Sequence, residues 1–454
     1  MRMRRLFALT VLLAAGCSER VADRPPPLDA FYYPVGVALA PSTSAAGGQA
    51  LLVTSSDVDL RYGPEEGSTL ISVDPLASLG ADNGVLTVLG ASRLDSYAGP
   101  ITVANSITCP GYAGSEALLA SRGQHRLWRF PLDAEGGVQP CAPGDCTVPL
   151  SPDVNDPYAI TLACRADGQR RSAYVAYLQS PPVAGYAAGV AWLSELDLED
   201  PARPLRTIPL SYYGPVSDLA FDETTDRLFA VGRYAGQVAP LFVLDLKGCP
   251  PPKAGESCPG PGVHTPIDLY ALQRGADLRS IALSNPIPGQ PRRAYISAVL
   301  YDADLATATG VRPSYDVGGV VMVLDLVEDP SGSPSVRLVR GVDAGLGTGQ
   351  IRVLPARGAG QRDLVVWANS VAGTVTVYDD DLGAIARVLT VDPKTGAPLA
   401  GREPFGLAVS DGGANATVYI AAFSSSTVAV LNVPLANPGL ADLLDGRIGK
   451  EFNP

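Results

Sequence analysis

The chain has 454 residues, of which 46% are hydrophobic, and a formal net charge of -12 at pH 7. This acidic balance argues against nucleic acid and anionic membrane surfaces as partners, because both repel a negatively charged protein. The 48 glycines and 41 prolines indicate many turns and few long helices, and the hydrophobic fraction is enough for a sizeable core.

The N-terminal segment has the features of a bacterial export signal. Three arginines among the first five residues precede an apolar run over residues 6–15, which is too short to span a hydrocarbon core of ~30 Å. The run ends in Leu13-Ala14-Ala15-Gly16-Cys17, which resembles the lipobox of bacterial lipoproteins. We therefore expect residues 1–16 to be a cleaved signal peptide and Cys17 to carry the lipid. The alternative is an ordinary signal peptide followed by a chance cysteine.

Residues 17–28 then form a lipid-bearing, proline-rich tether that cannot pack, and residues 29–454 are expected to form a single domain. The lipid on Cys17 makes the membrane a partner of the chain. Ser18 stands where an aspartate would resemble the inner-membrane retention signal of enteric bacteria. We therefore expect the cell envelope as the location, at the outer rather than the inner membrane, with the domain in the periplasm or on the cell surface.

A five-residue pattern of small and apolar residues recurs seven times in this domain, at intervals of roughly sixty residues. The copies lie at residues 35–39, 101–105, 158–162, 217–221, 279–283, 351–355 (degenerate) and 405–409. A second apolar run follows each copy, at residues 51–53, 117–119, 174–177, 228–231, 294–297, 364–367 and 418–421. Third runs at 70–74, 241–245 and 321–325 end in aspartate, and a weaker fourth is visible at 385–391.

These runs predict short strands that are buried on both faces, because they are continuous rather than alternating. Four antiparallel strands covered by neighbouring sheets on either side are the blade of a propeller. No repeat unit has a sustained period of 3.6 residues, which excludes a helical solenoid. The predicted fold is all-β: a seven-bladed β-propeller of four-stranded antiparallel blades.

The last unit carries a resemblance to a known group of propellers. Residues 402–412 (REPFGLAVSDG), 418–422 (VYIAA) and 426–432 (STVAVLN) are similar to the repeat of YVTN-type and lactonase-like propellers. Phe423 and Ser424 replace a common asparagine, and Asn432 replaces the terminal aspartate. The resemblance covers about residues 31–434 and implies the fold, but propellers host unrelated activities.

Closure of the ring is expected to use the C-terminal end of the domain. Residues 29–33 run directly into the first innermost strand, which leaves no loop for an N-terminal closing strand. We expect the outer strand of the seventh blade to come from residues 445–452.

Six cysteines remain after Cys17, and an even number in an exported chain indicates disulfides. Two pairs are local, Cys141–Cys146 and Cys249–Cys258, and the remaining pair, Cys109 and Cys164, falls near the ends of adjacent innermost strands. The alternative is a zinc site, but the sequence has no C-x-x-C motif.

Ligands of propellers usually bind at the mouth of the channel, where the loops from second to third strands meet the entries of the innermost strands. Polar and aromatic residues are frequent in these predicted loops. The candidate rim residues are Asp57, Asp59, Arg61, Tyr62, Arg122, Arg233, Tyr234, Tyr301 and Asn369, with His125, Asp302 and Asp304 nearby. They suit a polar or carboxylate-bearing ligand or a protein partner. The alternative is that they are solvated loop tips, hydrogen-bonded to neighbouring blades.

No metal or cofactor motif is recognisable. Asp57-x-Asp59 and Asp302-x-Asp304 could offer oxygens to Ca²⁺, but neither has the sequence of a dedicated calcium loop. The two histidines, His125 and His264, lie outside any metalloprotease motif, and no C-x-x-C-H motif for haem is present. We expect no cofactor and assign no catalytic residue.

The expected function is a non-enzymatic binding or scaffold module, anchored by lipid in the cell envelope. Its partner would be an envelope protein or a small polar ligand held at the channel rim. The alternative is a lactonase-type hydrolase with its site at the channel mouth.

Overall fold

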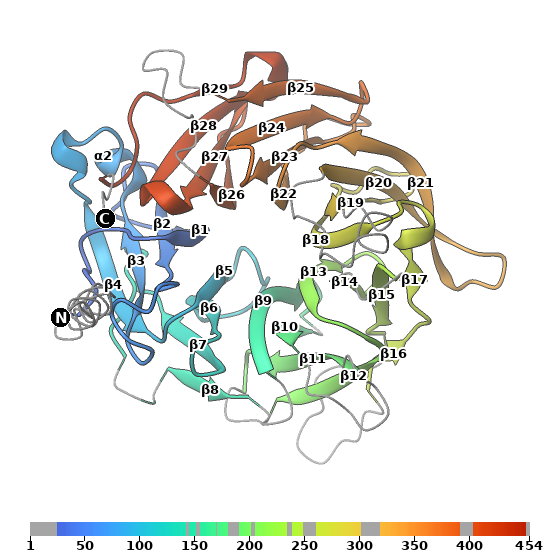
Figure 1. The fold of residues 1–454 in the computed structure, drawn as a ribbon, viewed down its shortest axis with the longest axis horizontal. Coiled ribbons are helices and arrows are strands. Elements are labelled where there is room, and N and C mark those ends of the chain that lie inside the picture. The colour runs from blue at the N-terminus through green and yellow to red at the C-terminus, as the bar shows by residue number, and fades with distance from the viewer. Residues whose placement is uncertain are drawn as a thin grey trace, which may run out of the picture.

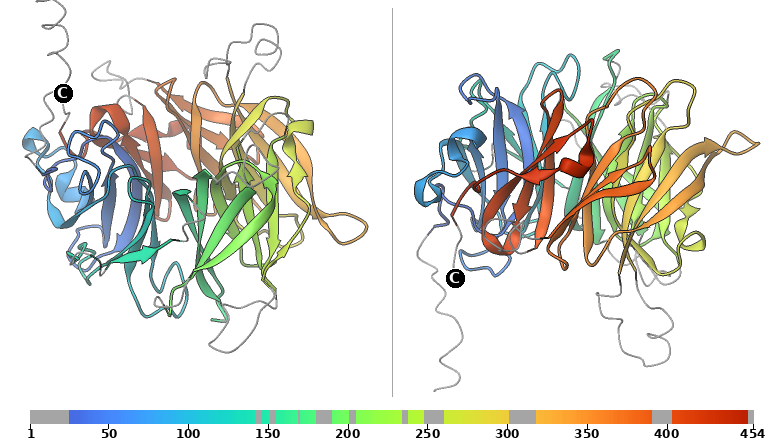
Figure 2. Two further views of the ribbon diagram at one scale, coloured as in Figure 1. Left: turned by 60° about the horizontal axis from the view of Figure 1, so that its bottom comes forward. Right: turned by 90° about the horizontal axis from the view of Figure 1, so that it is seen from above.

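The computed structural model describes residues 25–141, 144, 146–150, 155–168, 170–179, 190–200, 205–233, 238–247, 260–300, 318–390 and 403–450. Seven antiparallel sheets stand around a central axis, as Figure 1 shows, and the views in Figure 2 show them side by side in one ring. The seven-bladed propeller predicted from the repeats is confirmed.

Each blade is built from strands that are consecutive in the sequence: β1–β4, β5–β8, β9–β12, β13–β17, β18–β21, β22–β25 and β26–β29 form blades one to seven. The innermost strands are β1 (Pro34–Pro41), β5 (Ala98–Ala104), β9 (Asn155–Cys164), β13 (Val216–Asp222), β18 (Ala276–Leu283), β22 (Thr348–Val353) and β26 (Pro404–Asp411). The second strands are β2 (Gln49–Ser55), β6 (Glu116–Ser121), β10 (Arg171–Gln179), β14 (Arg227–Gly232), β19 (Arg293–Leu300), β23 (Leu364–Asn369) and β27 (Asn415–Ala422).

The third strands are β3 (Ser68–Val73), β7 (Arg126–Pro131), β11 (Val190–Asp197), β15 (Pro240–Asp245), β20 (Gly319–Glu328), β24 (Thr374–Asp379) and β28 (Thr427–Pro434). The outer strands are β4 (Val88–Leu94), β8 (Thr147–Pro149), β12 (Arg206–Tyr213), β16 (Gly262–Val263) with β17 (Ile267–Asp268), β21 (Pro334–Asp343), β25 (Ala384–Leu389) and β29 (Asp442–Leu443). In blade four both β16 and β17 pair with β15. Helix is limited, in the described residues, to α2 (Pro75–Ser78) and short 3₁₀ turns at 82–84, 269–271, 423–425 and 438–440.

The hydrophobic core is divided into seven clusters, one for each contact between neighbouring blades. Leu51 and Val53 of β2, for example, pack toward blade seven, whereas Leu52 packs toward blade two. All three side chains are fully buried. This two-sided burial explains why the second strands read as continuous apolar runs.

The ring closes between blades one and seven by apolar packing and one bridging residue. Phe31 and Val37 of blade one share a cluster with Val430 of blade seven. The fully buried Ile448 forms β-bridges both to Val428 in blade seven and to Leu79 in blade one. In the described residues, no strand of one blade joins the sheet of another.

The outer strand of blade seven was predicted at residues 445–452, and in that range the pairing with β28 is limited to an isolated bridge between Ile448 and Val428. The strand that pairs with β28 is β29, over residues 442–443, which lies just before that range. Residues 445–450 instead run on toward blade one, because Ile448 fits between the two blades and is buried there.

The innermost strands share a distortion at the end where they enter the sheet. A residue with positive φ precedes or begins each strand, in chain order Tyr33, Tyr97, Asp156, Gly214, Gly275, Gly347 and Glu403. Within its first five residues, each innermost strand carries one more residue than its partner, so that its pairing register shifts. Such a bulge changes the direction of the local side chains. The propeller therefore has seven bulges around one end of its axis.

The described cysteines are joined as the sequence predicted. Cys109, which follows β5, is bonded to Cys164 at the end of β9, and Cys141 is bonded to Cys146. Cys17, Cys249 and Cys258 lie outside the described residues. Among the helices that the structure describes, none is long and apolar enough to cross a membrane.

Candidate functional site

A cavity of about 390 Å³ occupies the end of the channel where the seven bulges meet. Each blade contributes to its wall the residue or residues of its bulge. The wall includes Val35, Pro100, Tyr158, Ser217, Arg279, Gln350 and Phe405 from the innermost strands, and Arg122, Leu178, Arg233, Val299 and Ser370 from the ends of the second strands. The bulges thus turn one side chain per blade toward a common space.

Two ion pairs at equivalent positions hold arginines at this mouth. Arg122 follows β6 of blade two, and its Nη2 lies 2.9 Å from Oδ2 of Asp156 in blade three. Arg233 follows β14 of blade four, and its Nη2 lies 2.8 Å from Oδ2 of Asp277 in blade five. Both carboxylates are buried, and both pairs have a second N–H···O contact, which makes them bidentate. Such pairs fix the direction of the guanidinium plane.

Asp277 binds a second guanidinium of the cavity wall. Nη2 of Arg279 lies 2.7 Å from the same Oδ2 atom that contacts Arg233. The side chains of Arg233 and Arg279 are 27% and 25% exposed, whereas that of Asp277 is 2% exposed. Two guanidinium groups that line the cavity therefore contact the same buried carboxylate.

A second carboxylate of the wall, Asp218 of β13, is held by hydrogen bonds. It accepts from the Ser280 hydroxyl, from the backbone N–H of Ile281 at 3.1 Å and from that of Leu219 at 2.9 Å. Burial raises the pKa of Asp218, and the nearby Arg352 guanidinium opposes that rise. Burial likewise lowers the pKa of Arg352.

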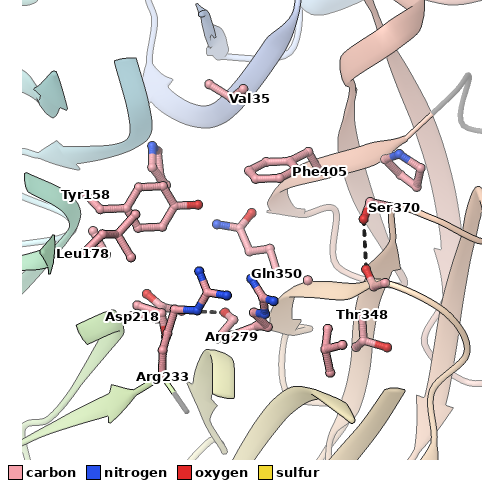
Figure 3. Close-up of a pocket in the computed structure, with 18 of the residues that line it drawn as sticks. Val35, Tyr158, Leu178, Asp218, Arg233, Arg279, Thr348, Gln350, Ser370 and Phe405 are labelled. Atoms are coloured by element: carbon pink, nitrogen blue, oxygen red, sulfur yellow. Dashed lines mark hydrogen bonds between the residues drawn. The ribbon is translucent and has the colours of Figure 1, made fainter. Parts of the chain in front are cut away.

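The opposite side of the cavity is aromatic. Phe405 is 39% exposed, although it lies on an innermost strand. Its ring centroid lies 6.5 Å from that of Phe423, which in turn lies 5.1 Å from that of Tyr33. Figure 3 shows Phe405 across the cavity from Arg233 and Arg279, with the Tyr158 hydroxyl and the Gln350 side chain directed into the space between.

Of the rim residues predicted from the sequence, Arg122 and Arg233 line the cavity. His125 lies beside the first of them, where its Nδ1 accepts from the backbone N–H of Asp156 at 3.2 Å. Tyr234 and Tyr301, with Asp302 and Asp304, lie outside the described residues.

The four predicted rim residues of blade one (Asp57, Asp59, Arg61 and Tyr62) interact within blade one. The fully buried Asp57 accepts from the backbone N–H groups of Arg61 at 2.9 Å and Tyr62 at 3.1 Å, and burial raises the pKa of its carboxyl to about 6. Asp59 pairs with Arg61 at 3.3 Å, and the Tyr62 ring packs edge-on against Tyr32. None of the four rim residues contributes to the cavity wall.

Asn369 is also engaged within the protein. Its side chain is buried at the end of β23, accepts from the Thr348 hydroxyl at 3.0 Å and donates to the Thr374 hydroxyl at 2.9 Å. No group of three or more His, Cys, Asp or Glu side chains that could hold a metal ion occurs in the described part of the chain. The oxygens of Asp57 that could have served Ca²⁺ are occupied by backbone donors.

Sequence reasoning did not single out Tyr158, Asp218, Arg279, Gln350 and Phe405. A signal for three of them was present in the repeat itself. Tyr158, Arg279 and Phe405 stand at the first position of their copies, where the seven residues vary from valine to arginine. This variation sets the position apart from the uniformly apolar ones, although Ile101 and Ile351 at the same position are buried in the core.

No protein-family model matches the sequence, and no curated protein matches it. Solved structures with a similar fold exist at low sequence identity. Sqt1 from Chaetomium thermophilum, bound to the N-terminus of a ribosomal protein, is 13% identical with a TM-score of 0.50, over 91% of this chain and 88% of that one. A 6-phosphogluconolactonase-type protein from Bacteroides uniformis is 13% identical with a TM-score of 0.39, over 91% and 85% of the chains. A Lactobacillus plantarum protein is 12% identical with a TM-score of 0.42, over 75% and 80%. These likenesses concern the propeller fold alone.

Proposed function

We propose that this chain is a lipid-anchored binding protein of the bacterial cell envelope whose propeller holds a small polar ligand in the mouth of its channel. The observation that carries the proposal is the cavity of about 390 Å³, to which all seven bulged strands contribute. Ligand sites of this size, about 300–1,000 Å³, bury most of the surface of a small molecule.

The polar groups of the wall are already held in place before any ligand arrives. Arg122 and Arg233 are fixed by bidentate contacts to buried aspartates of the next blade. Groups that are ordered in the free protein lose little conformational entropy when a ligand binds, so their contacts contribute more fully to affinity.

The anchor part of the proposal rests on the arginine-rich start, the apolar run and the lipobox-like residues 13–17 of the sequence. The tether that separates the lipid from the propeller would be shorter than the sequence predicted, because Pro26 is buried against the propeller and its carbonyl oxygen accepts from the Arg93 guanidinium at 3.3 Å.

The test is extraction of the bound ligand. The protein is purified from envelopes, denatured, and the released small molecules are identified by mass spectrometry. The double variant Arg233→Ala/Arg279→Ala is compared with Arg337→Ala, which removes a 69% exposed arginine of β21. We expect a compound that is released from the wild type and from Arg337→Ala but not from the double variant. Equal release from all three proteins, or from none, overturns the proposal.

A further inference from the structure

The cavity wall is divided by chemistry into two halves. One half contains Arg233 and Arg279 around the buried Asp277, and the other contains Phe405, which continues into Phe423 and Tyr33 outside the wall. A ligand that filled this space would meet cations at one end and an aromatic face at the other.

We propose that the ligand is a small carboxylate attached to a flat ring, with its carboxylate on Arg233 and Arg279 and its ring on Phe405. This inference rests on the proposed binding function and names the chemical class of the ligand.

The charge at the arginine end selects an anion. Arg233 and Arg279 line the cavity with side chains that are 27% and 25% exposed, and contacts of 2.8 and 2.7 Å to the buried Asp277 hold both guanidinium groups in place. Asp218 also lines the wall, where its carboxylate accepts hydrogen bonds from the Ser280 hydroxyl and from the backbone N–H groups of Leu219 and Ile281. Guanidinium groups present paired donors that match the two oxygens of a carboxylate.

The aromatic end selects a ring. Phe405 occupies the bulge of β26, and the bulge turns it toward the cavity and leaves it 39% exposed. An exposed phenylalanine costs free energy until an apolar surface covers it, and aromatic partners add a preference for offset or edge-on contact. The Tyr158 hydroxyl and the Gln350 side chain lie between the two ends (Figure 3). The Gln350 oxygen accepts from the backbone N–H of Leu407, so its NH₂ group and the Tyr158 hydroxyl suit a linker or ring substituent with hydrogen-bonding groups.

The test uses isothermal titration calorimetry with defined probes on the full mature chain. The probes are 3-phenylpropionate, its uncharged amide 3-phenylpropanamide, and hexanoate, which keeps the carboxylate but has no ring. Loss of the charge should weaken binding at least about tenfold, and loss of the ring about two- to tenfold. If the amide binds as tightly as the acid, or hexanoate as tightly as the phenyl compound, the proposal is wrong.

Variants then test which half of the wall binds the carboxylate and which half binds the ring. Arg279→Gln and Arg233→Gln should each weaken binding of 3-phenylpropionate about tenfold, whereas Phe405→Ala should remove the preference over hexanoate. Arg337→Gln is the matched control and should bind as the wild type does. Thermal unfolding of each variant shows that it folds, and two arginine variants keep the test decisive if one of them does not.

Two further outcomes separate this inference from the binding function itself. If 3-phenylpropionate gives no heat at millimolar concentration while extraction recovers a mouth-dependent cationic or neutral compound, the ligand class is wrong and the binding function stands. If a hexapeptide ending in phenylalanine binds at least about tenfold more tightly than N-acetylphenylalanine, contacts outside the cavity dominate. The ligand would then be a protein segment, and the proposal of a small molecule would be overturned.

Discussion

Arg122, directly after the second strand of blade two, forms a bidentate ion pair with Asp156 at the entry of the innermost strand of blade three. Arg233 and Asp277 repeat this relationship two blades further on. The pair links neighbouring blades and at the same time directs a guanidinium toward the cavity. Stability and the proposed binding at the mouth would therefore depend on the same side chains.

Asp277→Asn tests this coupling. The substitution removes the charge that two arginines share, and a neutral amide oxygen cannot accept from both as strongly. We expect the free energy of unfolding to fall by about 1–3 kcal/mol in urea titrations. Glu328→Gln, which removes an ion-pair carboxylate that is 56% exposed, should change it by less than about 1 kcal/mol. Equal effects of the two substitutions would show that burial of Asp277 is unimportant.

Asp57→Asn tests the pH dependence of the blade-one loop. Burial raises the pKa of Asp57 from 3.8 to about 6, so the folded protein binds this proton more tightly than the unfolded chain does. The contribution of Asp57 to stability is therefore present below pH 4 and lost as the pH rises through 6. The melting temperature of the variant minus that of the wild type should become more positive between pH 4 and pH 7. A constant difference would contradict the raised pKa.

Gly406→Ala tests the crowding of the innermost strands. An added Cβ at Gly406 would lie 2.5 Å from the backbone oxygen of Val35, across the junction of blades seven and one. We expect a loss of about 1–3 kcal/mol by urea unfolding, because backbone must move. Gly349→Ala is the control on β22, where the nearest atom would lie 3.7 Å away. Destabilisation by the control to the same degree would point to strand propensity rather than crowding.

Cys17→Ser tests the lipid anchor. The wild type should partition with membranes and gain the mass of attached acyl chains, and the variant should be recovered in the soluble fraction of the envelope. Continued membrane association of the variant, without acyl mass, would indicate a different anchor.

Cysteine pairing is open to direct measurement. Peptide mass mapping without reductant should recover Cys109–Cys164, Cys141–Cys146 and Cys249–Cys258. The joint Cys109→Ala/Cys164→Ala variant should lose about 2–4 kcal/mol of stability, because that bond closes a long loop. Free thiols at these positions in protein from the envelope would contradict export to an oxidising compartment.

The fold could be predicted because every blade repeats the same burial pattern. The second strands are enclosed on both faces, so runs such as Leu51-Leu52-Val53 identify them without any knowledge of the neighbouring blades. The outer strand of blade seven was misplaced because β29 has only two residues, too few for a pattern of burial to be visible.

The site was harder to predict. Arg122 and Arg233 could be placed at the mouth because they directly follow recognisable strands. Phe405 and Arg279 were not placed there, because the variable first position of the repeat does not reveal which side chains the bulges turn toward the channel. Asp57 and Asn369 were predicted as rim residues because they are polar. Their hydrogen bonds to neighbouring groups depend on the three-dimensional structure and could not be predicted from the sequence.

The junction between blades one and seven has a consequence for how the molecule is made and kept together. Ile448 pairs with both blades, so the ring cannot close during synthesis until this residue has left the ribosome. The cavity straddles the same seam, with Val35 on one side and Phe405 on the other. A molecule bound as proposed would contact the first and last blades together, so the occupied propeller should open between these blades more slowly than the empty one.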